Sequence, residues 1–126
     1  MSHDIVSDAL NMIMNAKRAG KKDLVVTRYS KLLLSILEIA KREGYVLNYD
    51  LNERDKRLKI KIGKLNTCQA VKPRFFAAVD EIEKYVRRFL PSRNFGIIIV
   101  STNKGLLTQH EAYENKIGGS IIAYFY

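Results

Sequence analysis

The sequence predicts an α+β fold made of two small α/β domains. Two segments carry apolar residues at helical spacing, a later segment alternates apolar and polar residues as in a strand hairpin, and residues 95–100 form a nearly continuous apolar run. The length of 126 residues suits one domain or two very small ones. With 47% hydrophobic and 28% charged residues, the composition is that of an ordinary globular protein.

The first helix is predicted over residues 4–19. Apolar side chains recur there at helical spacing, and the polar stripe on the opposite face includes Asp4 and Asn15. We expect Gly20 to end this helix, because glycine readily takes the left-handed backbone conformation that follows a helix. A strand is predicted at residues 24–27.

The second helix is predicted to begin after Ser30, an N-cap residue, and to end at Gly44. A hairpin follows, with turn residues at 52–55. Its apolar residues are expected to share one face, and they are Tyr45, Leu47, Tyr49, Leu51, Leu58, Ile60 and Ile62. The first domain, residues 1–66, therefore has the order α-β-α-β-β, with both helices against one side of a small sheet.

The second domain, residues 67–126, is predicted to be mostly β with short helices. It opens with a strand at 70–76, followed by a short helix that Asp80 caps and that ends before Pro91. The apolar run at 95–100 is typical of a strand buried on both faces.

A polar segment, residues 101–105, is expected to be an exposed loop after this strand. Thr108 and Glu111 have capping-box spacing and predict a brief helix through residue 115. The glycines 118 and 119 then break the chain before a final strand at 120–126.

The charge of the chain favours polyanions as partners. Lys and Arg number 22 against 13 Asp and Glu, which gives a formal charge of +9 and a pI near 9.7. No apolar run is long enough to span a bilayer, and the opening Ser2-His3-Asp4 resembles no signal peptide, so an intracellular protein without a membrane partner is expected. Cys68 is the one cysteine, and His3 and His110 are the two histidines, so we expect neither a disulfide nor a metal site nor another cofactor.

Basic residues are concentrated between residues 54 and 74, where Asp55 is the single acid. Phosphates are one candidate partner for them. The alternative, favoured for three of them, is that they solvate the outer face of the hairpin and protect an edge strand. These three are Arg57, Lys59 and Lys61. Lys72 and Arg74 differ, because they flank Pro73 and precede an aromatic pair in a strand that enters the second domain, where they are candidates for contact with a nucleic-acid backbone.

The most informative segment is Ser101-Thr102-Asn103-Lys104-Gly105. It presents hydroxyls, an amide and an ammonium group beside a glycine that allows close backbone approach, a combination suited to phosphate and ribose oxygens. A polar turn without function is the alternative. Ser101 and Lys104 match one Ser-x-x-Lys nucleophile pattern, but its companion motifs are absent, and Asn103-Lys104 stands without any phosphate-binding loop. Since no acid–base pair is evident, we expect no enzyme and no small-molecule substrate.

Several motifs together resemble the family of the eighth small-subunit ribosomal protein. They are Ser101-Thr102-Asn103-Lys104-Gly105, Thr108, Glu111-Ala112, Gly118-Gly119, the opening Asp4-Ile5-Val6-Ser7-Asp8-Ala9-Leu10 and the Ser30-Lys31 helix start. The segment Leu90-Pro91-Ser92-Arg93-Asn94-Phe95-Gly96 is similar to the archaeal and eukaryotic branch. The resemblance covers essentially the whole chain.

The resemblance implies a structural protein that binds an irregular helix in the central domain of small-subunit ribosomal RNA and organises its assembly. It further implies neighbouring ribosomal proteins as partners, a cytoplasmic location in the ribosome and, in isolation, a monomer. Ser101 to Gly105 would enter the RNA minor groove, while other residues bind the RNA backbone. The expected RNA-binding residues are Asp4, Asn15, Ser30, Lys31, Lys72, Arg74, Ser101, Thr102, Asn103, Lys104, Gly105, Gly118 and Gly119.

Three positions depart from the family pattern. Tyr29 stands where many relatives have Pro, Ser120 stands where bacterial relatives have Glu, and Asn103 takes a place often held by Ser. A competing hypothesis from another class is a protein-interaction module that is held in a ribonucleoprotein by other proteins. Salt dependence separates the two, because counterion release makes phosphate binding strongly salt-sensitive.

Overall fold

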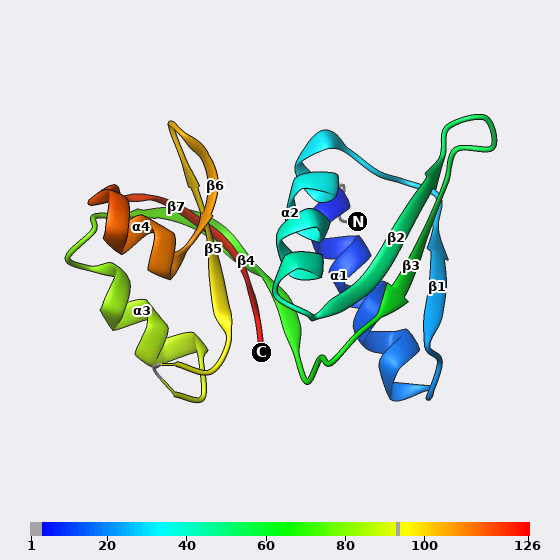
Figure 1. Cartoon of the computed structure of the whole chain (residues 1–126), viewed down its shortest axis with the longest axis horizontal. Helices are drawn as coiled ribbons and strands as arrows, with labels where there is room; N and C mark the ends of the chain where they lie inside the picture. Colours follow the sequence, from blue (N-terminus) through cyan, green and yellow to red (C-terminus); the bar gives the residue numbers. More distant parts are fainter. Residues whose placement is uncertain (1–3, 93) are drawn as a thin grey trace. The chain divides into compact units, whose positions relative to one another are not determined.

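The computed structural model describes residues 4–92 and 94–126 (Figure 1). The chain divides into two compact units, the first ending at Cys68 and the second running from Gln69 to Tyr126. Both units combine helices with an antiparallel sheet, so the predicted α+β fold is confirmed. The predictions above that involve Ser2, His3 and Arg93 lie outside the described residues.

The first unit has the predicted order α-β-α-β-β. Its elements are α1 (Ile5–Arg18), β1 (Asp23–Val26), α2 (Lys31–Arg42), β2 (Val46–Asn52) and β3 (Arg57–Ile62). The three strands form an antiparallel sheet in the order β1-β3-β2, and both helices lie on the same side of it (Figure 1). Leu10, Ile13 and Leu37 are fully buried from the helices, and Leu58 and Ile60 from the sheet, so the two layers share one core.

The expected alternation in β2 is wrong at its start. Val46 pairs with Ile62 and Asn48 pairs with Lys61, which leaves Leu47 as one extra residue in its strand. Such a β-bulge changes the face on which the residues before it lie. As a result Val46 is buried, whereas Leu47, expected on the apolar face, is 66% exposed.

The basic residues Arg57, Lys59 and Lys61 are exposed on β3. However, β3 lies between β1 and β2 and is the central strand of its sheet. Their interpretation as guards of an edge strand is therefore wrong, while their place on the outer face of the hairpin agrees with the sequence pattern.

The second unit forms a four-stranded sheet in the order β4-β7-β5-β6. Its elements are β4 (Cys68–Ala77, which begins one residue before the unit), α3 (Ile82–Phe89), β5 (Ile97–Thr102), β6 (Gly105–Thr108), α4 (Gln109–Asn115) and β7 (Gly119–Phe125). Residues 97–100 are buried, as expected for a strand covered on both faces. Ile82 and Val86 of α3 pack with Ile98 and Ile121 of the sheet to form the core of this unit.

Local signals for helix ends are confirmed at two positions and wrong at a third. The Ser30 hydroxyl accepts a hydrogen bond from the Leu33 amide at 3.1 Å, and Thr108 and Glu111 form the expected capping box. Asp80 does not cap α3. The residue before this helix is Glu81, whose carboxylate instead accepts from the Ala78 amide at 3.0 Å, outside the helix.

The single thiol provides a test of the first core. Cys68 is 3% exposed, its Sγ donates to the Leu10 carbonyl at 3.7 Å, and burial raises its pKa to about 12. We therefore expect native protein to resist iodoacetamide at about pH 8, because the thiolate is the reactive form. Intact mass should show one adduct only in denaturant, and rapid labelling of native protein would contradict this packing.

Candidate nucleic-acid interface

The segment predicted as an exposed loop is the tip of a β-hairpin. Ser101 and Thr102 are the last two residues of β5, Gly105 is the first residue of β6, and Thr102 pairs with Gly105. Only Asn103 and Lys104 form the turn between the strands. Figure 1 shows β5 and β6 side by side. The expectation of a loop over the whole segment is thus wrong. The strand β6 was not predicted, because its four residues are too few to show a clear alternation.

The Thr102 side chain fixes the shape of this turn. Its hydroxyl donates to the Gly105 carbonyl at 2.8 Å and accepts from the Lys104 amide at 3.1 Å. Gly105 has φ +102, a conformation that favours glycine. Because the hydroxyl proton of Thr102 is used inside the turn, the side chains of Asn103 and Lys104 are the groups that the tip exposes.

The glycine pair at the start of β7 allows two close approaches of the main chain. A Cβ on Gly119 would lie 2.3 Å from the Ser101 carbonyl oxygen, and a Cβ on Gly118 would lie 2.5 Å from that of Ala77. Both distances are far below van der Waals contact. The residues at these positions must therefore lack a side chain, and Ser120 can then pair with Ser101 across β5 and β7.

These features surround one surface depression of about 440 Å³. It is lined by Phe76, Ser101, Thr102, Asn103, Lys116, Ile117, Gly118, Gly119 and Ser120. The fold thus brings together five of the predicted RNA-binding residues, from the hairpin and from the glycine pair. Phe76 and Lys116 were missed as site residues.

A strand pattern in β4 could have revealed Phe76. Side chains alternate between the two faces of a strand, so Phe76 shares a face with Lys72 and Arg74, and all three are exposed. On the other face, Val71 and Ala77 are buried in the core. Lys116 gave no comparable signal, because its position depends on the left-handed conformation, φ 54, in which it ends α4.

The predicted residues of the first unit lie at helix ends and on an exposed helix face. The Asp4 carboxylate caps α1 by accepting from the Ser7 amide at 3.2 Å, and Ser30 caps α2, which begins with the exposed Lys31. Asn15 is exposed on α1, roughly 16 Å along the helix from Asp4 at 1.5 Å per residue. Asp4 and Asn15 therefore do not form one compact site.

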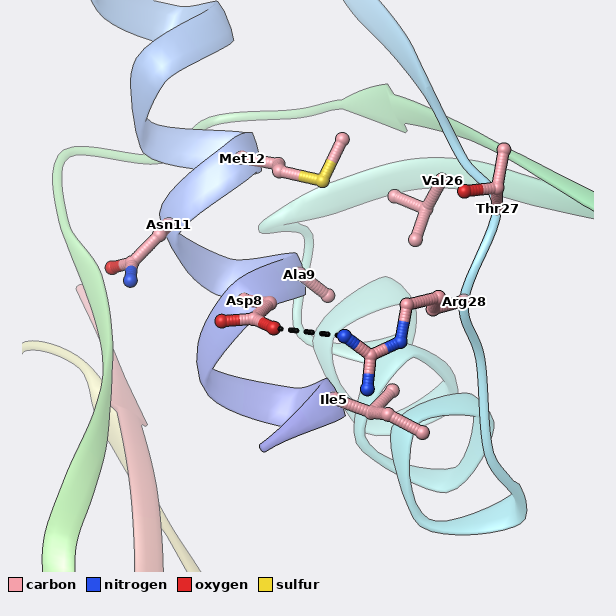
Figure 2. Close-up of a pocket in the computed structure, with 8 residues that line it drawn as sticks. All are labelled: Ile5, Asp8, Ala9, Asn11, Met12, Val26, Thr27 and Arg28. Atoms are coloured by element: carbon pink, nitrogen blue, oxygen red, sulfur yellow. Dashed lines mark hydrogen bonds and ion pairs between the residues drawn. The ribbon is translucent and has the colours of Figure 1, made fainter. Parts of the chain in front are cut away.

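A second depression, of about 340 Å³, lies between α1 and the segment that follows β1 (Figure 2). Its lining residues are Ile5, Asp8, Ala9, Asn11, Met12, Val26, Thr27 and Arg28. Arg28 reaches across to Asp8 at 3.5 Å, as the dashed line in Figure 2 shows. Both side chains are more than one-third exposed, so this ion pair contributes at most about 1 kcal/mol. The lining contains no nucleophile paired with a base.

Among residues 4–92 and 94–126, no three His, Cys, Asp or Glu side chains are grouped so that they could hold a metal ion. No helix of the described chain combines the length and the apolar character needed to cross a membrane.

Comparison with known proteins places the chain in the class of ribosomal proteins, which are structural proteins and not enzymes. A family model described as ribosomal protein S8 matches residues 4–126. The small ribosomal subunit protein uS8 of Nanoarchaeum equitans is 45% identical over the full length of both chains, and that of Archaeoglobus fulgidus is 39% identical over the same extent. That of Methanococcoides burtonii is 36% identical over 98% of this chain and 97% of the relative.

The chain belongs to the ribosomal protein S8 family. The predicted resemblance to this family, and to its archaeal and eukaryotic branch, is confirmed by the family match and by these archaeal relatives.

The glycine pair yields a stability prediction. Gly119→Ala should destabilise the chain by about 1–3 kcal/mol, because the new Cβ meets a backbone oxygen that cannot move independently of β5. Gly20→Ala is the control, since nothing lies within 4 Å of its Cβ and only its φ of +76 opposes alanine, at a cost of about 1 kcal/mol. Urea unfolding measures both, and equal stability of Gly119→Ala and wild type would refute the close approach.

Proposed function

We propose that the chain is a structural constituent of the small ribosomal subunit that binds directly to the central domain of small-subunit ribosomal RNA and organises its assembly. The observation that carries the proposal is the depression in which Ser101, Asn103 and the glycine pair come together. Membership of the S8 family and the formal charge of +9 support it. By the same proposal the protein acts in the cytoplasm, within the ribosome, beside other small-subunit proteins, and is monomeric in isolation.

The hairpin tip carries groups suited to the minor groove of an RNA helix. That groove is wide and shallow in A-form RNA and exposes ribose hydroxyls and base edges. In this proposal the Ser101 hydroxyl and the Asn103 amide bond to these groups, and the Lys104 ammonium binds phosphate. Thr102 acts mainly by holding the turn, and Gly105, which has nothing within 4 Å of its Cβ position, by allowing the RNA close to the main chain. Gly118 and Gly119 act by letting β7 approach Ala77 and Ser101, which shapes the surface that the RNA contacts.

The rigidity of the hairpin supports this role. β5 enters the site from a stretch in which residues 97–100 are at most 4% exposed, and the Thr102 hydroxyl bonds across the turn. A site that is ordered before binding loses less conformational entropy when the RNA docks. The predicted second domain, residues 67–126, would then supply most of the RNA contacts.

The remaining predicted residues are proposed to bind the RNA backbone. Lys72 and Arg74 lie on the exposed face of β4 that also carries Phe76. Lys31 begins α2, and Ser30 retains a hydroxyl proton for a phosphate oxygen, because its cap uses an oxygen lone pair. Asn15 would donate from the exposed face of α1, and Asp4 would accept from a ribose hydroxyl.

Salt dependence and single substitutions test the proposed site. Lys104→Ala should weaken binding to a central-domain fragment and reduce the slope of log affinity against log salt by about 0.7–0.9, the value for one lost phosphate contact. Asn103→Ala should weaken binding by about 1 kcal/mol with the slope unchanged, because it removes a neutral hydrogen bond. Filter binding between about 50 and 200 mM salt measures both effects.

Lys59→Ala is the matched control, because it removes one exposed cation from the outer face of the first sheet. If Lys59→Ala and Lys104→Ala reduced affinity and slope equally, the proposed site would be wrong. Binding that ignored salt and all these changes would favour the protein-interaction alternative.

Ser30 allows its two roles to be separated. Ser30→Ala should lower the free energy of unfolding by about 1 kcal/mol through loss of the cap. Ser30→Asp keeps a cap and places a favourable negative charge at the start of α2, yet repels phosphate. It should therefore preserve thermal stability and weaken RNA binding. RNA binding by Ser30→Asp as tight as that of wild type would argue against a phosphate at this helix end.

A further inference from the structure

Phe76 is a large aromatic side chain that is 68% exposed at the edge of the depression beside the hairpin tip. We propose that Phe76 is a stacking platform for one unpaired base of the bound RNA, so that the depression is a base-binding subsite. This inference rests on the proposed function and names the part of the RNA that the site takes.

The surroundings of Phe76 set it apart from its neighbour in the chain. Phe75 packs on Tyr85, with ring centroids 4.6 Å apart, and joins the edge of the core. Phe76 points to the other face of β4 and stacks on no other ring of the described chain. Its ring is therefore open to a planar partner from outside the chain.

The wall beside Phe76 is formed partly by main chain. Gly118 and Gly119 line the depression, and a Cβ on either would collide with a backbone oxygen. Both glycines therefore present main chain, without a side chain, to the depression that Phe76 also lines. A flat base suits such a space better than a bulky branched side chain does.

Polar groups at the rim match the edge of a base. Ser101 and Ser120 provide hydroxyls and Asn103 an amide, all of which line the same depression. Such groups form hydrogen bonds with the edges of unstacked bases, while an aromatic ring stacks on the faces of these bases. The subsite thus offers a partner for each surface of an unstacked base.

The charge around the depression favours RNA over an apolar or basic peptide. Lys116 lines it, Lys104 is exposed on the adjoining turn, and none of the lining residues is acidic. A base brought in by RNA carries its phosphate with it, and the cations at the rim can neutralise that phosphate.

Tryptophan fluorescence tests the stacking directly, because the sequence contains no Trp. Phe76→Trp, with binding to the central-domain fragment retained, should show strong quenching of its emission when the RNA is added. Leu47→Trp is the matched control: Leu47 is 66% exposed on the bulge in β2, and its emission should change little. Unchanged Phe76→Trp emission at saturating RNA would overturn the proposal.

Affinity provides the second measurement. Phe76→Ala should lose about tenfold or more in affinity, as expected for one base–aromatic stack, with the salt slope unchanged. Phe76→Leu, which keeps apolar area without a ring, should lose nearly as much, whereas Phe95→Ala, at a 48% exposed position, should bind as wild type. Thermal melts by circular dichroism should show that these variants are folded.

The outcomes distinguish this inference from the proposed function. If Phe76→Ala and Phe76→Leu bound normally while Lys104→Ala was weakened, the RNA-binding function would stand and the stacking subsite would be refuted. Full affinity in Phe76→Leu alone would show an apolar contact without stacking and would also overturn it. If wild type did not select the central-domain fragment, the proposed function itself would fail, and the subsite with it.

Discussion

The close approach of β7 to β5 at Gly119 is the constraint on which the candidate site depends. The main chain passes so near the Ser101 carbonyl that a Cβ would lie 2.3 Å from its oxygen. This contact fixes the pairing of Ser101 with Ser120 and holds residues 117–120 beside the hairpin turn. A second approach, of Gly118 to the Ala77 carbonyl, does the same on the side of β4. Only glycine at positions 118 and 119 permits both approaches, which bring the main chain of β7 to the depression beside Ser101.

The frame behind the site is held by buried polar contacts as well as by apolar packing. Gln109, 1% exposed, accepts from the Ile98 amide at 2.8 Å and donates to the Gly96 carbonyl at 3.1 Å. It thereby ties the start of α4 to the start of β5, and the Thr108–Glu111 capping box fixes the same helix end. Satisfied buried hydrogen bonds of this kind specify one arrangement of the chain, because breaking them leaves desolvated groups unpaired. The exposed side chains of Asn103 and Lys104 therefore extend from a hairpin whose position is fixed by these hydrogen bonds.

The helix caps at Ser30 and Thr108 and the buried strand β5 could be predicted from the sequence, because interactions between residues close together in the chain determine them. Features that depend on pairing with a distant strand could not be predicted. The bulge at Leu47 arises from the register of β2 on β3, and β6 forms because β5 offers it a partner. The hairpin and glycine motifs of the site were recognisable from their resemblance to a family. The strand pattern of β4 places Phe76 on the face of Lys72 and Arg74, but that Phe76 lines the depression depends on how β4 is arranged around β7. Lys116 gave no signal, because its position depends on the left-handed end of α4.

The most direct test of the account is the change in backbone amide chemical shifts when isotope-labelled protein is titrated with a central-domain fragment of small-subunit ribosomal RNA. We predict the largest changes at residues 101–105 and 116–120 and at Phe76, with little change at Lys59 on the outer face of the first sheet. If the largest changes fell on that outer face and residues 101–105 were unaffected, the hairpin would not be the RNA-binding element, and the central claim would be wrong.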